Sequence, residues 1–362
     1  MGWSDDEAEN REEIPLGTDT VYCFDALTGE EQWTQSYPCR YQRRLRVGDV
    51  GRYGGPSATP TFDEATGCLY TLSVDGDLRC WDTKDRGRPV WARNLYDEHD
   101  VKRRPNVGRG QRDYGYTSSP LVLGDRLIVE VGGTGGTVMA FDKETGDRSW
   151  ASHYKEPAGH SGGPARIQID GADCVAALTL KHLVVMRADI DHEGETIDTI
   201  QWKTDFGCNI PTPAVIGNRL LITSGYNRKH MALFEASLNG LREKWTAREY
   251  ATVASPVFYR DHVYLVDHSL KCVDLNTGEL KWQGGGFHHG SCLVTAADDK
   301  IIVFGDHDLA LVDALSDDEY HVLSEISGIT PGACYPHVAL SDGIIACKDS
   351  EGNLVALSVR VP

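Results

Sequence analysis

Short apolar runs alternate with turn-forming residues along the chain. Residues 21–24, 138–141 and 270–273 are four-residue runs of mostly hydrophobic or β-prone side chains, and each is followed by an aspartate and then a Thr-Gly pair. Runs of this length bounded by turn signals are typical of β-strands. We find no amphipathic run with helical spacing and convincing length. The pattern therefore predicts an all-β chain.

One nine-residue module recurs in three strong copies that share an aspartate, a Thr-Gly pair and a final tryptophan. The copies, given by their aspartate, glycine and tryptophan, are Asp25, Gly29 and Trp33; Asp142, Gly146 and Trp150; and Asp274, Gly278 and Trp282. The aspartate can accept hydrogen bonds from backbone N–H groups two or three residues later, and the glycine can take a positive φ. The module therefore predicts strand, tight turn and strand, with the tryptophan wedged against a neighbouring sheet.

Weaker copies of the module lie between the three strong ones. They are Asp82 with Trp91, a longer acidic hairpin ending at Trp202, a run ending at Trp245, a run with Tyr320 in place of tryptophan, and the final apolar run 354–357. Together with the strong copies they make eight. Each copy after the first follows a small-residue or proline start and a hairpin, so one unit is four strands, A to D, over ~40–60 residues, the signature of a propeller blade.

We therefore expect a β-propeller of four-stranded blades that forms a single domain over residues 1–362. The expected units are approximately 1–36 (partial), 54–95, 114–152, 160–205, 208–248, 251–285, 288–326 and 333–362 (partial). The first unit lacks its inner strands A and B, and the last lacks strand D. Two counts stay open: eight units with an incomplete first blade, or a seven-bladed ring closed by the N-terminal strand. In the incomplete ring, exposed strand edges would favour edge-strand association.

The charge of the chain restricts its partners. A net charge of −18 argues against nucleic acid, because nothing in the chain would neutralise many phosphates. The local exception is a set of arginines and tyrosines in the long connections 37–56 and 93–116, and these are residue types common at binding hot spots. The candidate partner-loop residues are Tyr41, Arg43, Arg44, Tyr53, Arg103, Arg104, Tyr114 and Tyr116. The alternative is that the tyrosines only pack these loops onto the propeller.

The repeat module resembles that of the pyrroloquinoline-quinone (PQQ)-like propellers. Within that family, the layout is similar to bacterial PQQ-binding-like repeat proteins related to the lipoprotein of the outer-membrane β-barrel assembly machinery. The resemblance implies a non-catalytic scaffold that presents loops and a funnel to a protein, peptide or glycan partner. It also implies export to the periplasm or cell envelope, although no signal peptide is visible in a chain that resembles an N-terminally truncated one, so the localisation stays open.

The alternative interpretation is a PQQ-dependent alcohol or sugar dehydrogenase. Enzymes of that kind use a vicinal Cys-Cys ring, a Trp floor and a Ca²⁺ site beside an Asp base. The ten cysteines here include no adjacent pair and no CxxC, so we expect no quinone cofactor and no zinc ribbon. The cysteines are interpreted as small buried hydrophobes, and whether any of them pair stays open.

Histidines suggest a second alternative, a metal-binding funnel. His160, His288, His289 and His337 fall at or just before expected A-strand starts, which line the channel of a propeller. Imidazoles that converge there could bind Zn²⁺ or Cu²⁺. These residues belong to units separated along the repeat, so we favour structural hydrogen bonds and expect no metal.

Overall fold

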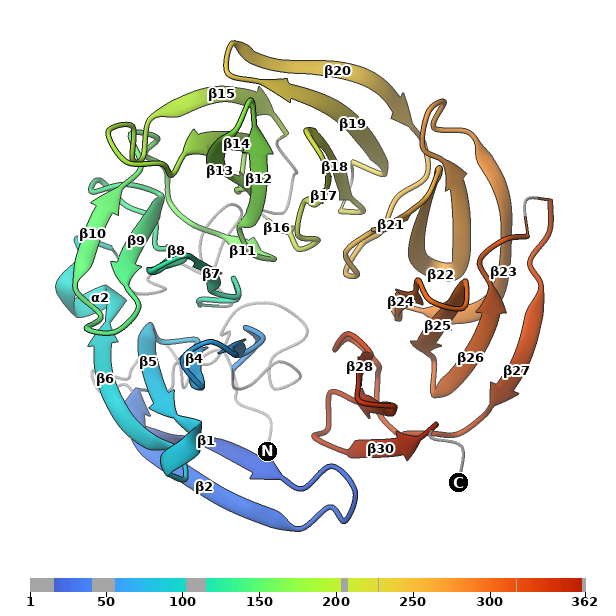
Figure 1. Cartoon of the computed structure of the whole chain (residues 1–362), viewed down its shortest axis with the longest axis horizontal. Helices are drawn as coiled ribbons and strands as arrows, with labels where there is room; N and C mark the ends of the chain where they lie inside the picture. The colour runs from blue at the N-terminus through green and yellow to red at the C-terminus, as the bar shows by residue number, and fades with distance from the viewer. Residues whose placement is uncertain are drawn as a thin grey trace, which may run out of the picture. The chain divides into compact units, whose positions relative to one another are not determined.

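The computed structural model describes residues 16–40, 56–101, 115–202, 208–226, 228–316 and 318–359. These residues divide into two compact units. Figure 1 labels most of the strands and helices named below. The first holds the described residues up to Thr212, without the turn Asp25–Glu30, and also Ala236–Leu241. The second holds Asp25–Glu30, Pro213–Glu235 and the described residues from Arg242 onward.

The first unit contains a hairpin, three four-stranded sheets and a short parallel pair. The hairpin is β1 (Leu16–Phe24) with β2 (Glu31–Arg40). The sheets are β3 (Thr61–Asp63), β4 (Cys68–Leu72), β5 (Asp77–Asp82) and β6 (Arg88–Asn94); β7 (Leu121–Leu123), β8 (Arg126–Glu130), β9 (Val138–Asp142) and β10 (Arg148–Ala151); and β12 (Ala165–Ile169), β13 (Ala172–Leu178), β14 (His182–Arg187) and β15 (Thr196–Gln201). The parallel pair is β11 (His160–Ser161) with β16 (Cys208–Asn209).

The second unit contains four sheets. They are β17 (Ala214–Ile216), β18 (Arg219–Ser224), β19 (His230–Ser237) and β20 (Gly240–Ala247), whose β19–β20 turn is counted with the first unit; β21 (Val257–Tyr259), β22 (His262–Asp274) and β23 (Leu280–His288); β24 (Ser291–Thr295), β25 (Lys300–Gly305), β26 (Asp308–Asp313) and β27 (Val322–Ile326); and β28 (Ala339–Ser341), β29 (Ile344–Lys348) and β30 (Leu354–Ser358).

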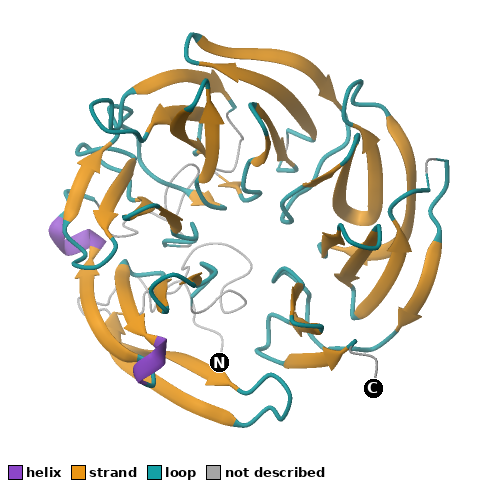
Figure 2. Ribbon diagram, viewed as in Figure 1, coloured by secondary structure: helices purple, strands orange, loops and turns teal. Residues whose placement is uncertain are grey.

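The predicted all-β class is confirmed (Figure 2). Within the described residues the helices are η1 (Thr83–Asp85) and α2 (Leu95–Glu98), and neither has the length or apolar run needed to span a membrane. Each of the seven sheets with three or four strands is a meander of sequential strands, as expected of a blade. The first repeat copy exists only as the hairpin β1–β2 in the part of the chain that is described, so seven is the count of blades.

The three strong repeat turns have the predicted geometry. Oδ1 of Asp142 accepts from the backbone N–H groups of Glu144 and Thr145, both at 2.9 Å. Asp25 and Asp274 make the same pair of hydrogen bonds at 2.8–2.9 Å. The turn glycines have φ near +75°, which an L-residue with a side chain adopts only with strain. Local sequence alone therefore specifies these turns.

The repeat tryptophans dock onto the turn of the next sheet. Trp91 Nε1 donates to Lys143 O at 3.0 Å, and Trp245 Nε1 donates to Leu275 O at 2.9 Å. Each indole also covers the turn glycine so closely that an added Cβ would lie 2.7 Å from the ring, at Gly146 and at Gly278 respectively. The glycine of one copy and the tryptophan of the preceding one thus form a single packing unit.

Trp150 is buried, as predicted, with 7% of its surface exposed. Its Nε1 has no hydrogen-bond partner among the described residues. The next sheet, β12–β15, replaces the Thr-Gly turn with a longer acidic hairpin, so the carbonyl that Trp91 and Trp245 use has no equivalent there. Trp33, on the two-stranded hairpin, is only half-buried. None of the ten cysteines, all of which are among the described residues, forms a disulfide, and most are buried.

Candidate binding pocket

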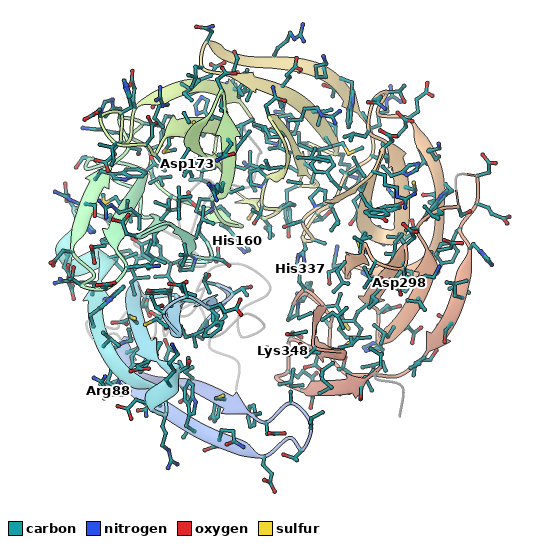
Figure 3. The ribbon with its side chains drawn as sticks, in the orientation of Figure 1. Arg88, His160, Asp173, Asp298, His337 and Lys348 are labelled. Atoms are coloured by element: carbon teal, nitrogen blue, oxygen red, sulfur yellow. The ribbon has the colours of Figure 1, made fainter. Side chains whose placement is uncertain are left out.

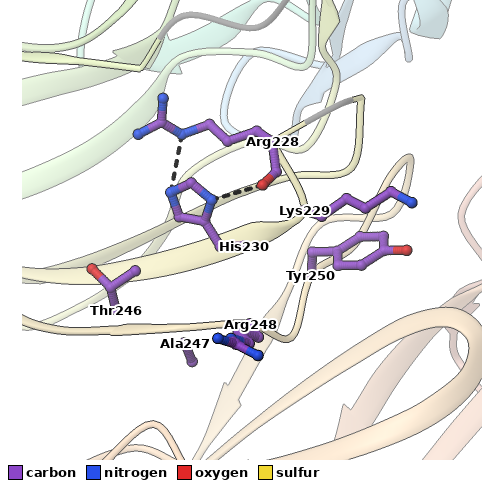
Figure 4. A pocket seen from close by; sticks show the side chains of 7 residues that line it. All are labelled: Arg228, Lys229, His230, Thr246, Ala247, Arg248 and Tyr250. Carbon is purple, nitrogen blue, oxygen red and sulfur yellow. Dashed lines mark hydrogen bonds between the residues drawn. The ribbon is translucent and has the colours of Figure 1, made fainter.

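An open hollow of about 680 Å³ lies in the second unit at one end of β19 and β20 (Figure 4). Two stretches of chain line it: the connection between β18 and β19, and the end of β20 with the residues that follow. The lining residues are Arg228, Lys229, His230, Thr246, Ala247, Arg248 and Tyr250. Antiparallel order explains why they meet, because β19 begins where β20 ends.

Arg228 and His230 are locked together on one side of the hollow. Arg228 Nε donates to His230 Nε2 at 3.1 Å, and His230 Nδ1 donates to Arg228 O at 2.9 Å (Figure 4). This pattern assigns the neutral imidazole with its proton on Nδ1. Burial lowers the pKa of the Arg228 guanidinium from its ordinary value, yet the group stays cationic at neutral pH. Lys229, with φ of 51°, holds the turn between them.

Tyr250 also lines the hollow, on the stretch of chain that follows β20. Burial, and then the charge of the nearby Asp267 carboxylate, raise the pKa of Tyr250. The Asp267 side chain is buried, with 3% exposed. Lys271 Nζ lies 5.4 Å from the Tyr250 ring centre and 2.7 Å from the Glu249 carboxylate. Tyr250 therefore connects the hollow to the next sheet, β21–β23.

The electrostatics of the lining favour an anion. Arg228, Lys229 and Arg248 are permanent cations, and none of the lining residues is acidic, in a chain whose net charge is −18. Guanidinium groups bind carboxylates with paired hydrogen bonds, and Tyr250 adds an aromatic contact surface. The lining offers no nucleophile beside a general base, so the arrangement suits binding rather than bond cleavage.

Of the four histidine candidates, three lie in the second unit and one in the first. His288 and His289 lie together, with ring centres 5.2 Å apart. His160, in the first unit, places Nδ1 3.5 Å from Cys208 Sγ, and His337 accepts a hydrogen bond from the Ser255 N–H at 3.2 Å just before β28 (Figure 3). Within the described ranges, no three His, Cys, Asp or Glu side chains are arranged to hold a metal ion. The structural hydrogen bonds expected of His337 and His160 are present.

A histidine that sequence reasoning missed joins the pair. His268 on β22 lies with its ring centre 5.1 Å from that of His288 and 6.0 Å from that of His289. Nothing in the local sequence singles it out. Its place opposite His288 follows from the register of β22 and β23, which only pairing of the strands reveals.

Most of the predicted partner-loop residues cannot be placed. Tyr41, Arg43, Arg44, Tyr53, Arg103, Arg104 and Tyr114 lie outside the described residues. Tyr116 is described, and here the prediction of a partner contact is wrong: 1% of its surface is exposed, and its hydroxyl donates to Val131 O at 3.0 Å. Its ring packs on Tyr96, with centres 4.9 Å apart. Tyr116 is a packing residue, as the alternative interpretation held.

Sequence reasoning also missed Arg228, Lys229 and Arg248. The signal available was a group of basic residues on two connections at the same end of one sheet, in a strongly acidic chain. The residues are separated by two whole strands, so the group becomes visible only when the strands are folded back on each other.

The comparisons with known proteins agree with this architecture. A family model described as "Outer membrane protein assembly factor BamB" matches residues 17–284. The crystal structure of BamB from Moraxella catarrhalis is similar, with a TM-score of 0.63 and 14% identity over 91% of this chain and 88% of that one. No curated protein matches in sequence. The fold is a seven-bladed β-propeller of the PQQ-like class.

Two further solved structures are similar at lower scores. One is the computationally designed Ika8 protein, with a TM-score of 0.44 and 13% identity over 84% of this chain and 98% of that one. The other is Hsv2 from Kluyveromyces lactis, with a TM-score of 0.48 and 10% identity over 82% of this chain and 91% of that one.

Proposed function

Because the chain belongs to the family of the outer membrane protein assembly factor BamB, we propose that it is a non-catalytic scaffold that binds a protein partner. We further propose that the pocket of Arg228, Lys229, His230, Arg248 and Tyr250 receives an acidic segment of that partner. The family description, an assembly factor, fits a protein as the partner. The single observation that supports the site is a cationic lining in a chain of net charge −18.

The pocket has the composition expected of a contact centre. Arginine and tyrosine are enriched at the residues that dominate binding energy in interfaces. Arg228 is held in place by His230, so less side-chain entropy is lost when it pairs with a carboxylate. Long-range repulsion from the rest of the acidic chain would select against a long polyanion, which favours a short carboxylate-bearing segment over nucleic acid.

A peptide-binding measurement tests the proposal. The probe is a fluorescein-labelled synthetic peptide of alternating glutamate and glycine, and the control probe replaces each glutamate with glutamine. We expect the glutamate peptide alone to bind, with an affinity that falls as salt is added. The double variant Arg228→Ala/Arg248→Ala should weaken binding by about tenfold or more, equivalent to ~1.4 kcal/mol.

The matched control is Arg166→Ala. Arg166 is also an exposed arginine, in the first unit, paired with Asp173 at 2.7 Å (Figure 3 labels Asp173), and its loss should leave peptide binding unchanged. Equal binding of the glutamine peptide, or unchanged binding by the double variant, would overturn the assignment of the site. Binding of an acidic oligosaccharide but not of the peptide would replace the protein partner with a glycan.

A further inference from the structure

A second group of side chains lies on β21–β23, the sheet that follows the pocket and contacts it through Lys271. It comprises His268 on β22, His288 at the end of β23 and His289 directly after it, and we call it the histidine cluster. The three ring centres lie 5.1–6.0 Å from one another. His268 and His288 are exposed to solvent, and His289 is partly exposed.

The backbone beneath the cluster is strained. His268 and His288 face each other across β22 and β23, and both have left-handed φ, 62° and 48°. Glycine or asparagine would fit such positions with less strain. Because both side chains are exposed, packing does not require an imidazole there. A strained residue whose side chain the core does not need is an indication of function.

The third histidine is connected to a buried charge. His289 Nδ1 lies 3.6 Å from Asp267 Oδ1, and this buried nitrogen has no hydrogen-bond partner in the described part of the chain. The charge of Asp267 also acts on Tyr250, which lines the basic pocket, and helps to raise the pKa of its hydroxyl. A proton added to His289 would be held by Asp267 and would turn this close approach into an ion pair.

The other side chains around the cluster are either paired with a group of opposite charge or uncharged. On β22, Lys271 is paired with Glu249 from the connection after β20, at 2.7 Å. The Tyr335 ring, from the segment before β28, stacks on His289 with centres 6.0 Å apart. His337 of the same segment accepts from the Ser255 N–H, which holds it in the neutral form. Protonation of the cluster therefore adds positive charge with only Asp267 beside it to compensate.

We propose that the histidine cluster extends the basic pocket in a proton-dependent way, so that the acidic segment of the partner binds more tightly at mildly acidic pH. This inference rests on the proposed function, because the pocket supplies the constant part of the binding. Histidine is the side chain whose charge changes between about pH 5 and 8. The cluster lies at the same end of its sheet as the pocket does of β17–β20, because β23 ends at His288 as β20 ends at Ala247. Lys271 on β22 also reaches Glu249 and the Tyr250 ring beside the pocket.

The test measures the affinity of the glutamate peptide between about pH 7.5 and about pH 5.5. We expect wild-type binding to tighten by about fivefold or more on acidification, as added charges on the protein attract carboxylates. The triple variant His268→Asn/His288→Asn/His289→Gln should bind as wild type does at the higher pH and lose the gain at the lower one. Asparagine is chosen because it tolerates left-handed φ.

Two controls separate the cluster from other histidines. His230→Gln changes the histidine in the pocket itself. His307→Gln changes a histidine of the next sheet, in the turn between β25 and β26, whose Nδ1 donates to Thr330 O at 2.7 Å. Both should keep the gain on acidification. Thermal unfolding and histidine-selective NMR spectra show whether the triple variant is folded and whether its remaining imidazoles titrate as before.

The outcomes are distinct. Binding that is tight but independent of pH would overturn this inference and leave the proposed function standing. A gain that survives in the triple variant and disappears in His230→Gln would assign the proton dependence to the pocket and overturn the role of the cluster. Absence of peptide binding at every pH would overturn the proposed function, and this inference with it.

Discussion

The two ends of the sheets in the second unit differ in the charge of their side chains and in the role that we assign to them. At one end, the β22–β23 turn carries Asp274 and Glu279, and the neighbouring β24–β25 turn carries Asp298 and Asp299 (Figure 3 labels Asp298). At the other end are Arg228, Lys229, Arg248 and the histidine cluster. The carboxylate of Asp274 is occupied by its own backbone, whereas the lining of the pocket faces solvent.

The difference shows how a repeat protein separates stability from recognition. The turn end repeats because turn glycines such as Gly146 and Gly278 must receive the tryptophan of the preceding sheet. At the opposite end the contact between successive sheets, Lys271 with Glu249 and Tyr250, uses no residue of the repeat module, so the sequence there can vary from one sheet to the next. Substitutions at the turn end should therefore affect stability alone, and those at the pocket end should affect binding alone.

The largest effect should come from Trp282→Ala. Trp282 is 5% exposed and its Nε1 donates to Ser316 O at 2.6 Å, so truncation leaves a cavity and should lower the free energy of unfolding by about 3–5 kcal/mol. Guanidinium denaturation followed by circular dichroism measures it. Trp33→Ala, in the same module but half-buried, should cost clearly less. Equal losses of unfolding free energy in the two variants would mean that the local turn motif provides the stabilisation, and not the docking of the tryptophan onto the next sheet.

Gly278→Ala should have the next largest effect. Its φ is +77°, and an added Cβ would lie 2.7 Å from the Trp245 ring, so we expect a loss of about 2–3 kcal/mol from backbone strain and overpacking. Gly217→Ala is the matched control, because its φ is +58° with nothing within 4 Å of an added Cβ; it should lose about 1 kcal/mol. Thermal and chemical unfolding of both variants separate the clash from the strain.

Asp274→Ala should give a smaller, pH-dependent loss. Burial acts to raise the pKa of Asp274, but the backbone N–H groups of Thr277 and Asn276 outweigh it, so the pKa is lower than usual. Because the folded pKa is below the unfolded value of about 3.9, the stabilisation is complete above that pH and is lost as the pH falls toward the folded pKa. We expect about 1 kcal/mol at neutral pH.

Unfolding of wild type and Asp274→Ala in urea, from about pH 6 down to about pH 3, checks this sign. The difference between the two proteins should shrink as the pH falls. Asp261→Ala, an exposed aspartate in the adjacent β21–β22 turn, provides the control and should show no such trend. A difference that grows toward acid would contradict the assignment of the carboxylate as the acceptor.

Arg248→Ala should have the smallest effect on stability. Its side chain is exposed, and surface substitutions away from special features usually change stability by no more than ~0.5 kcal/mol. The same substitution should weaken binding of the glutamate peptide measurably. If Arg248→Ala destabilised the protein as much as Gly278→Ala does, the assignment of stability to the turn end and of binding to the pocket end would be wrong.

The repeat architecture was predictable because its information is local. An aspartate, a glycine with positive φ and a tryptophan within nine residues specify a turn and its strands wherever they occur. The all-β class and the burial of Trp150 follow from that. The candidate site was not predictable in the same way. Of the histidines named from the sequence, only His288 and His289 belong to the histidine cluster.

What the sequence determined by itself is the repeating module; what the tertiary structure decided is which unrelated residues meet. Trp150 ends the same repeat module as Trp282, yet its indole N–H finds no acceptor among the described residues, because the following sheet lacks the Thr-Gly turn. Arg228 meets Tyr250, and His268 meets His288, because antiparallel pairing brings residues some twenty positions apart to the same end of a sheet. Those contacts depend on the register of paired strands, which no short stretch of the sequence specifies.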